Sequence, residues 1–246
     1  VLIGIGNVLG MTYALSLRPT DVSEATPPRK LKIGFKPVVF VMCLLPVIVP
    51  LIWLLDRGGL VPGGGLGGLP LGYWNRYFGD WGLNFLLISL ALRPMRELTG
   101  AAYLARYNRM IGLFAFFYAT LHVLSYVWLE WGLTWSHMGS DILTRYFIIF
   151  GIMAFIPLLV SAITSTKKWT KRLGGQTWKR IHRSIYAANL LIAAHFILAA
   201  VTADAGIGRA LIYAVLIVLL LGYRVREYLR RQHKALSVQA APARNG

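Results

Sequence analysis

The chain has 246 residues, of which 57% are apolar and only 14% are charged, and its mean hydropathy is +0.58. Globular domains of this length are much more polar, so the composition indicates a protein that lies in a membrane and contacts lipid. The formal net charge is +17. The basic residues fall between long apolar runs without any nucleic-acid-binding motif, which argues against nucleic acid as a partner. Cys43 is the single cysteine, which excludes an intrachain disulfide and a thiolate metal cluster.

Residues 1–35 are expected to form a cytoplasmic tail without regular structure. Its first 17 residues are apolar, but three glycines and an asparagine weaken them as a membrane span. Met11 is a candidate for the natural start of the chain. We expect the membrane domain to cover residues 36–228, followed by a second cytoplasmic tail at 229–246 that is too short to fold alone.

Two helices are expected in the first half of the membrane domain. Nineteen uncharged residues lie between Lys36 and Asp56, enough to cross a hydrocarbon core of roughly 30 Å. The second apolar run, from Tyr77 to Leu92, is shorter and contains Asp80. The glycine-rich stretch between them, residues 61–72, is expected to be a flexible loop, because no strand precedes it as a nucleotide-binding fingerprint would require.

Four further helices are expected in the second half of the chain. They lie between Arg109 and Glu130, between Arg145 and Lys167, between Arg183 and Asp204, and between Arg209 and Arg224. The last interval holds only fourteen uncharged residues, but tilting and snorkelling arginines accommodate a short span.

The distribution of basic residues predicts the orientation of these helices. Twenty-two Lys and Arg residues fall on one side of the predicted membrane and four on the other, and cytoplasmic loops are enriched in such residues. Both termini are therefore expected in the cytoplasm, which requires an even number of crossings. The predicted fold is all-α, an integral membrane six-helix bundle.

Two histidines stand out within the predicted spans. His122 lies eight residues before Glu130 and His195 nine residues before Asp204, so both are about 12 to 14 Å from the same side of the membrane. Two neutral imidazoles at one depth can bind one haem iron from both faces and make it a one-electron carrier. Alternatively, the two histidines hydrogen-bond across the bundle. They could also form the relay of a non-haem transporter or proton channel.

A third histidine, His182, lies thirteen residues before His195, about 20 Å lower on the same helix and on a face rotated by about 140°. It is either a contact of a second haem or quinone, or an interfacial basic residue. His137, in a predicted loop, and His233, in the tail, are expected to be solvated.

The segment TKKWTKRLGGQTWKRIHR, residues 166–183, is expected to be a basic loop that anchors the chain at the cytoplasmic surface. Arginine binds carboxylates and phosphates in a bidentate manner. Some members of a set of four arginines near this surface could therefore bind haem propionates or a flavin phosphate. The set is Arg106, Arg109, Arg172 and Arg180.

Three stretches carry a resemblance to a known family. They are residues 79–97, closed by Arg93 and Pro94; residues 106–132, with Arg106, Gly112, His122 and Tyr126; and residues 164–196, with Leu173, Gly174, Trp178, His182, Tyr186 and His195. These blocks resemble the MsrQ (YedZ) haem-binding subunits, members of the ferric-reductase-like transmembrane superfamily. The resemblance covers roughly residues 36 to 231, and the first 35 residues lie outside it.

The resemblance implies an electron-transfer subunit of the bacterial inner membrane. Such subunits receive electrons from the quinone pool or a flavin and pass them through haem b. The acceptor is a periplasmic molybdopterin subunit of the MsrP type, which repairs oxidised methionines and itself catalyses the chemistry on methionine sulfoxide. FMN is commonly assigned to the family, so the resemblance implies a flavoprotein.

The chain also departs from the wider superfamily, whose ferric reductases and NADPH oxidases carry two histidines on each of two helices and a fused flavin and nicotinamide domain. Here the third predicted helix offers only His122, and no such domain is expected. These departures argue against a self-contained NADPH oxidase and leave the number of haems open between one and two. A stand-alone ferric reductase component remains an alternative.

Overall fold

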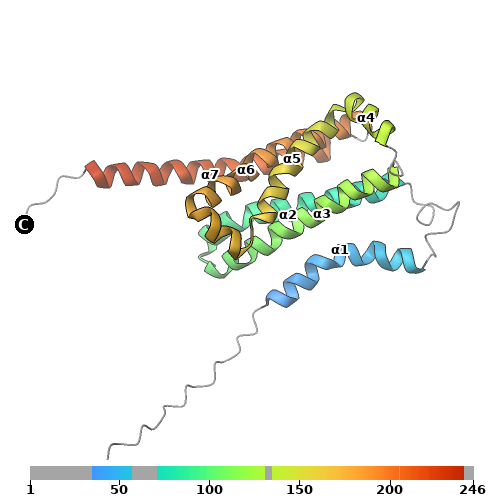
Figure 1. Ribbon diagram of the computed structural model, residues 1–246. Helices are drawn as coiled ribbons and strands as arrows, with labels where there is room; N and C mark the ends of the chain where they lie inside the picture. Colours follow the sequence, from blue (N-terminus) through green and yellow to red (C-terminus); the bar gives the residue numbers. More distant parts are fainter. Residues whose placement is uncertain (1–34, 57–70, 131–134, 205, 241–246) are drawn as a thin grey trace, which may run out of the picture. The chain divides into compact units, whose positions relative to one another are not determined.

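The computed structural model describes residues 35–56, 71–130, 135–204 and 206–240, and the regular structure of these residues is entirely helical (Figure 1). Nearly all of the predicted N-terminal tail lies outside the described residues, as does the glycine-rich stretch up to residue 70. Within the described part of the chain, the prediction of an all-α protein is confirmed.

The helices are α1 (Lys36–Asp56), α2 (Leu71–Thr99), the 3-10 turn η2 (Ala102–Leu104), α3 (Ala105–Ser125), the π-helical turn η3 (Tyr126–Glu130), α4 (Trp135–Thr144), α5 (Tyr146–Ile163), α6 (Lys167–Thr202) and α7 (Gly208–Ala240). Four segments are long and apolar enough to cross a membrane: Ala102–Trp128, Tyr146–Ile163, Lys167–Thr202 and Gly208–His233. The chain is therefore a multi-pass membrane protein.

Two stretches that were expected to be loops are helical, and α7 extends into the predicted C-terminal tail. The basic segment 166–183 is not a loop: Thr166 caps the start of α6 by accepting a hydrogen bond from the backbone N–H of Trp169, and a kink at Gly174 (φ 73°, ψ 157°) divides that helix. Residues 229–240, predicted as tail, continue α7, and His137 lies in α4 rather than in a loop. Charge indicates where a segment lies but not its conformation, and Lys, Arg and Gln are good helix formers.

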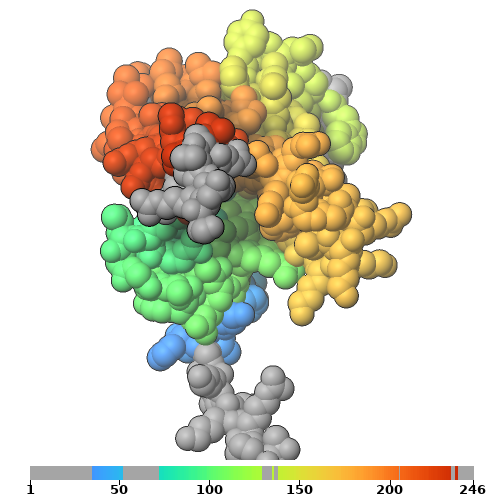
Figure 2. Space-filling model, turned by 90° about the vertical axis from the view of Figure 1, so that its left-hand side faces the viewer, coloured from blue at the N-terminus to red at the C-terminus, as the bar shows by residue number. Residues whose placement is uncertain are grey.

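Two helix pairs form the centre of the protein. α2 packs along α3, and α5 packs along α6, while α7 lies against both α6 and α2. Figure 2 views this arrangement from one end, with α2 and α3 in green, α6 in orange and α7 in red. Tyr118 and Ala188 are fully buried between these helices. This packing brings His122 of α3 and His195 of α6 close together in the interior.

Proline in α1 explains how this helix is attached to the rest. Pro50 has no N–H, so the carbonyl of Pro46 lacks its usual helical donor. The hydroxyl of Tyr77 on α2 donates to that carbonyl oxygen at 2.7 Å, and Tyr118 on α3 donates to the carbonyl of Cys43 at 2.9 Å. Two tyrosine hydroxyls therefore hold the proline-bent helix against α2 and α3.

Candidate functional site

His122 and His195 face one another inside the bundle. His122 is on α3 and His195 on α6, and their ring centroids are 6.1 Å apart with the ring planes at 82°. The prediction that both histidines lie at one depth is thus matched by their proximity in space.

A backbone carbonyl holds each ring in the same way. The Nδ1 atom of His122 lies 2.8 Å from the carbonyl oxygen of Asn75 on α2, and Nδ1 of His195 lies 2.7 Å from the carbonyl oxygen of Phe147 on α5. Since a carbonyl oxygen only accepts, each Nδ1 must carry the proton and donate it. The Nε2 atom of each neutral ring is then the one with a lone pair available to bind a metal.

Asn75 also holds the backbone of His122. Its side-chain Nδ2 donates to the carbonyl oxygen of His122 at 3.0 Å and to the hydroxyl of Ser125 at 3.2 Å, and Ser125 donates to the same carbonyl at 2.8 Å. The π-helical turn that begins at Tyr126 follows directly, and such turns occur frequently at functional sites. His122 is therefore held at both its ring and its backbone.

Each ring lies against a glycine. A Cβ atom on Gly79 would be 3.0 Å from Nδ1 of His122, and one on Gly151 would be 2.9 Å from Nδ1 of His195. Each glycine lies four residues after the residue whose carbonyl holds the ring. Gly79 follows Asn75 on α2, and Gly151 follows Phe147 on α5. Only a residue without a side chain lets the imidazoles approach these helices so closely.

An ion pair lies next to the first of these contacts along the chain. Asp80, which follows Gly79, accepts from Arg209 of α7 at 2.7 Å. The guanidinium of Arg209 also lies 5.9 Å from the ring centre of Phe196, the residue after His195. This pair connects α2 to α7 and places the Arg209 guanidinium near Asp80, which follows Gly79, and near Phe196, which follows His195.

His182 is not brought to the histidine pair. Its Nε2 lies 3.2 Å from the hydroxyl of Thr164, and its ring stacks on Trp178 with centroids 4.0 Å apart. The indole N–H of Trp178 donates to the carbonyl of Thr164 at 3.0 Å. His182 therefore belongs to a separate cluster where α5 ends and α6 begins.

The four arginines proposed for cofactor binding are all exposed: Arg106, Arg109, Arg172 and Arg180. Arg109 lies thirteen residues before His122, roughly 20 Å along α3, and Arg172 lies over the ring of Trp169. The structure does not place them beside the histidine pair.

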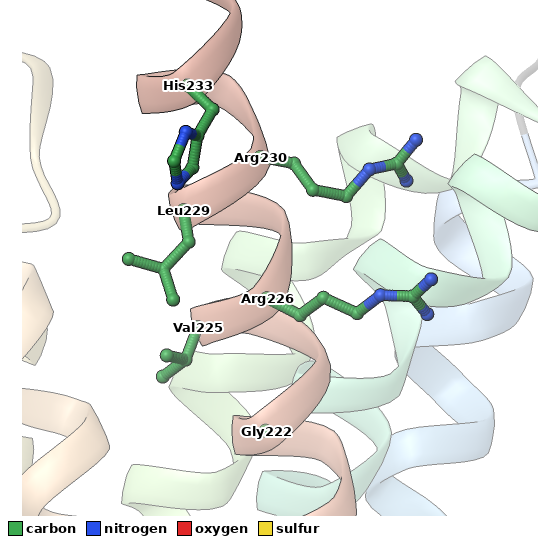
Figure 3. A pocket seen from close by; sticks show the side chains of 6 residues that line it. All are labelled: Gly222, Val225, Arg226, Leu229, Arg230 and His233. Carbon is green, nitrogen blue, oxygen red and sulfur yellow. The ribbon is translucent and has the colours of Figure 1, made fainter.

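The surface groove in Figure 3 is also separate from the histidine pair. Its lining residues all belong to α7: Gly222, Val225, Arg226, Leu229, Arg230 and His233. His233 is exposed there, in agreement with the expectation that it is solvated.

Sequence reasoning did not identify the partners of the two histidines. Backbone carbonyls leave no trace in side-chain chemistry, and the two glycines looked like ordinary interior glycines. One signal was available: Asn75–Gly79 (NRYFG) and Phe147–Gly151 (FIIFG) both end in Phe-Gly. The histidines follow their carbonyl partners by nearly equal intervals, 47 and 48 residues.

Four apolar spans and a pair of facing histidines from different helices describe a multi-pass membrane protein with two imidazoles that could hold one metal. Residues 78–193 match the family described as ferric reductase like transmembrane component. The chain is 42% identical over 194 residues to the protein-methionine-sulfoxide reductase haem-binding subunit MsrQ of Rhodospirillum rubrum, with 79% of this chain and 88% of that protein covered. It is 39% identical over 200 residues to MsrQ of Bordetella pertussis, with 81% and 93% covered. The chain belongs to the MsrQ family of membrane subunits.

A second group of relatives matches along more of the chain. The magnetosome protein MamZ of Magnetospirillum gryphiswaldense is 44% identical over 234 residues, which cover 93% of this chain. The chain spans only 35% of the length of that relative. No solved structure matches the chain significantly.

Proposed function

We propose that the chain is a haem b electron-transfer subunit in which His122 and His195 are the axial ligands of one haem. The observation that carries the proposal is the distance between the two rings. Two metal–nitrogen bonds of about 2 Å, with roughly 1 Å from each ring centre to its nitrogen, place two axial imidazoles roughly 6 Å apart. The observed separation of 6.1 Å fits an iron between them.

The donor set favours haem over a metal ion held by protein ligands alone. Among the described residues, no group of three or more His, Cys, Asp or Glu side chains could hold a metal ion. A porphyrin supplies four ligands itself and needs only two from the protein. The histidine pair supplies that number.

The protein's own groups then determine what the site does. His122 and His195 would hold the haem from its two sides, and a haem held in this way would supply one-electron transfer rather than oxygen chemistry. The carbonyls of Asn75 and Phe147 keep Nδ1 protonated and make Nε2 a better donor.

We further propose a direction for electron flow. The chain forms six membrane-spanning helices in a bacterial inner membrane. Both termini lie in the cytoplasm, because the basic residues concentrate at the end opposite the histidine pair. Residues 36–228 form the haem domain, with cytoplasmic tails at 1–35 and 229–246. Electrons leave on the periplasmic side, toward a molybdopterin methionine sulfoxide reductase of the MsrP type. The names of the MsrQ relatives support such a partner.

The donor side is assigned to the basic end. Electrons enter there from the quinone pool or from a flavin such as FMN, and His182 contacts the cofactor on that side, a second haem or the quinone. A subset of four exposed arginines binds haem propionates or a flavin phosphate there: Arg106, Arg109, Arg172 and Arg180.

The route is tested by rapid mixing. The purified protein is reduced without oxygen and mixed with an MsrP-type enzyme, with and without methionine sulfoxide, while the haem absorbance is followed. We expect fast reoxidation only when both enzyme and methionine sulfoxide are present. Haem reoxidation at the same rate with and without the enzyme contradicts the assigned partner.

A second candidate is a stand-alone ferric reductase component. The family match, described as ferric reductase like transmembrane component, favours it. In the same instrument, a ferric chelate replaces the enzyme. If the ferric chelate reoxidises the haem faster than the MsrP-type enzyme does, the result supports this candidate over the first.

A further inference from the structure

We propose that Gly79 and Gly151 are positioning residues that hold the ring planes of His122 and His195 nearly perpendicular to each other. This inference rests on the proposed haem site and deepens it. Neither glycine touches the iron; each acts through the ring that lies against it.

The first step of the argument is that each ring has little freedom of rotation. One edge of the His122 ring is fixed by the hydrogen bond from Nδ1 to Asn75, and the neighbouring Cε1 atom would lie only 3.1 Å from a Cβ on Gly79. The His195 ring is fixed in the same way by Phe147 and Gly151, where the corresponding Cε1 distance is 3.0 Å. Carbonyl and glycine are one helical turn apart, so together they hold one edge of the ring against the helix.

The second step is that the two ring planes are set independently. α2 holds His122 of α3, and α5 holds His195 of α6, and these are the two most closely packed helix pairs in the described part of the chain. The 82° between the ring planes follows from how the two pairs face each other, not from any contact that both rings share.

The third step is what an added methyl group would do. The 2.9 Å contact at Gly151 is closer than real Cβ atoms make with their neighbours, and the 3.0 Å contact at Gly79 is tighter than nine in ten of them, so either the ring or its helix must shift. The ring cannot move without straining its hydrogen bond to the carbonyl. An alanine at either glycine therefore turns or displaces one axial ligand and leaves the other in place.

The angle between axial imidazoles has a direct spectroscopic signature. In low-spin ferric haem, perpendicular rings leave two iron d orbitals nearly equal in energy and give one strongly anisotropic EPR signal at high g value. Parallel rings separate these orbitals and give a rhombic spectrum with three resolved features. The shape of the EPR spectrum therefore reports ring orientation separately from electron-transfer activity.

The experiment compares EPR spectra and haem affinity of the purified full-length wild type, Gly79→Ala and Gly151→Ala. The wild type should give the single anisotropic signal. Each variant should move toward a rhombic or mixed spectrum and bind haem roughly 10- to 100-fold more weakly, as is typical when a group supporting a metal ligand is disturbed.

Gly112→Ala is the matched control. Gly112 lies on α3 with His122, and its Cβ would make an ordinary 3.7 Å contact with Ser89. This variant should keep the wild-type spectrum and haem affinity.

Two results overturn the inference. One is a rhombic EPR signal from the wild type. This test does not depend on whether the glycine variants fold. The other is an unchanged spectrum in both glycine variants. A wild-type protein that binds no low-spin haem contradicts the proposed function itself, so the two failures are distinguishable.

Discussion

Arg224 of α7 donates a hydrogen bond at 3.0 Å to the carbonyl oxygen of Leu90 on α2. That carbonyl has no helical donor because Pro94, four residues later, has no N–H. The same guanidinium donates to the hydroxyl of Tyr186 on α6 at 3.2 Å. One arginine thus connects three helices at the position where proline interrupts the hydrogen bonding of α2.

Replacing Arg224 by Met should destabilise the protein by about 1–3 kcal/mol, the cost of leaving a buried carbonyl without a partner. Thermal unfolding in detergent measures the change. Arg226→Met is the control, because Arg226 is exposed on the same helix and should tolerate the change.

A double-mutant cycle isolates the role of the proline. Pro94→Ala restores an N–H that can satisfy the carbonyl of Leu90, so Arg224→Met should cost less in that background. Equal costs in both backgrounds would show that the hydrogen bond to Leu90 is not the origin of the effect.

The attachment of α1 can be followed through the single cysteine. Cys43 is buried, and the hydroxyls of Tyr77 and Tyr118 hold the surrounding turn. The double variant Tyr77→Phe with Tyr118→Phe should increase the rate of Cys43 alkylation by a maleimide, because α1 opens more often. Tyr73→Phe, at an exposed tyrosine on α2, should leave the rate unchanged. A rate in the double variant equal to that of the wild type would mean that apolar packing alone holds α1.

Sequence patterning predicted the helical class and the locations of the four apolar spans between residues 102 and 233, because long uncharged runs in a membrane protein leave little choice of structure. It also placed His122 and His195 at one depth, since helical rise converts residue counts into distances. It did not predict how the rings are held. A backbone carbonyl accepts a hydrogen bond in every helix, and only the packing of α2 on α3 and α5 on α6 shows which carbonyl meets which ring.

The charged end of α2 should make stability depend on pH. Glu97 accepts from Tyr223, Arg93 and Arg231. Partial desolvation raises the pKa of Glu97, but the hydrogen bonds from Tyr223 and Arg93 and the charges of Arg93 and Arg231 outweigh it, so the pKa lies below its ordinary value. A lowered pKa stabilises the folded state above the ordinary value of about 4.3 and loses that contribution as the pH falls through the folded-state pKa.

Thermal unfolding measured from neutral to acidic pH tests this contribution. Glu97→Gln should flatten the acid-side loss of stability. Glu227→Gln is the control, because Glu227 forms its ion pair with Arg230 of its own helix. A Glu97→Gln variant with the same pH profile as the wild type would show that the network contributes nothing to acid sensitivity.

Asn75 offers a test on only one of the two histidines. Asn75→Ala removes the side-chain hydrogen bonds to the His122 carbonyl and to Ser125 but keeps the carbonyl that holds the ring. We expect haem affinity to fall by roughly tenfold, at the low end of effects seen when groups that support a metal ligand are removed. Haem titration of the haem-free protein measures it. An affinity as high as that of the wild type would limit Asn75 to its backbone carbonyl.

The most direct test of the haem assignment is the reduced-minus-oxidised visible spectrum of the detergent-purified protein, with haem quantified as the pyridine haemochrome. The wild type should show sharp b-type bands, and His122→Ala and His195→Ala should each lose the low-spin spectrum, while His233→Ala keeps it. A haem-to-protein ratio of two would place a second haem at the His182 cluster. A low-spin spectrum retained in both histidine variants would contradict the ligand assignment, and a protein that stays colourless with ample haem would point to a transporter or proton channel.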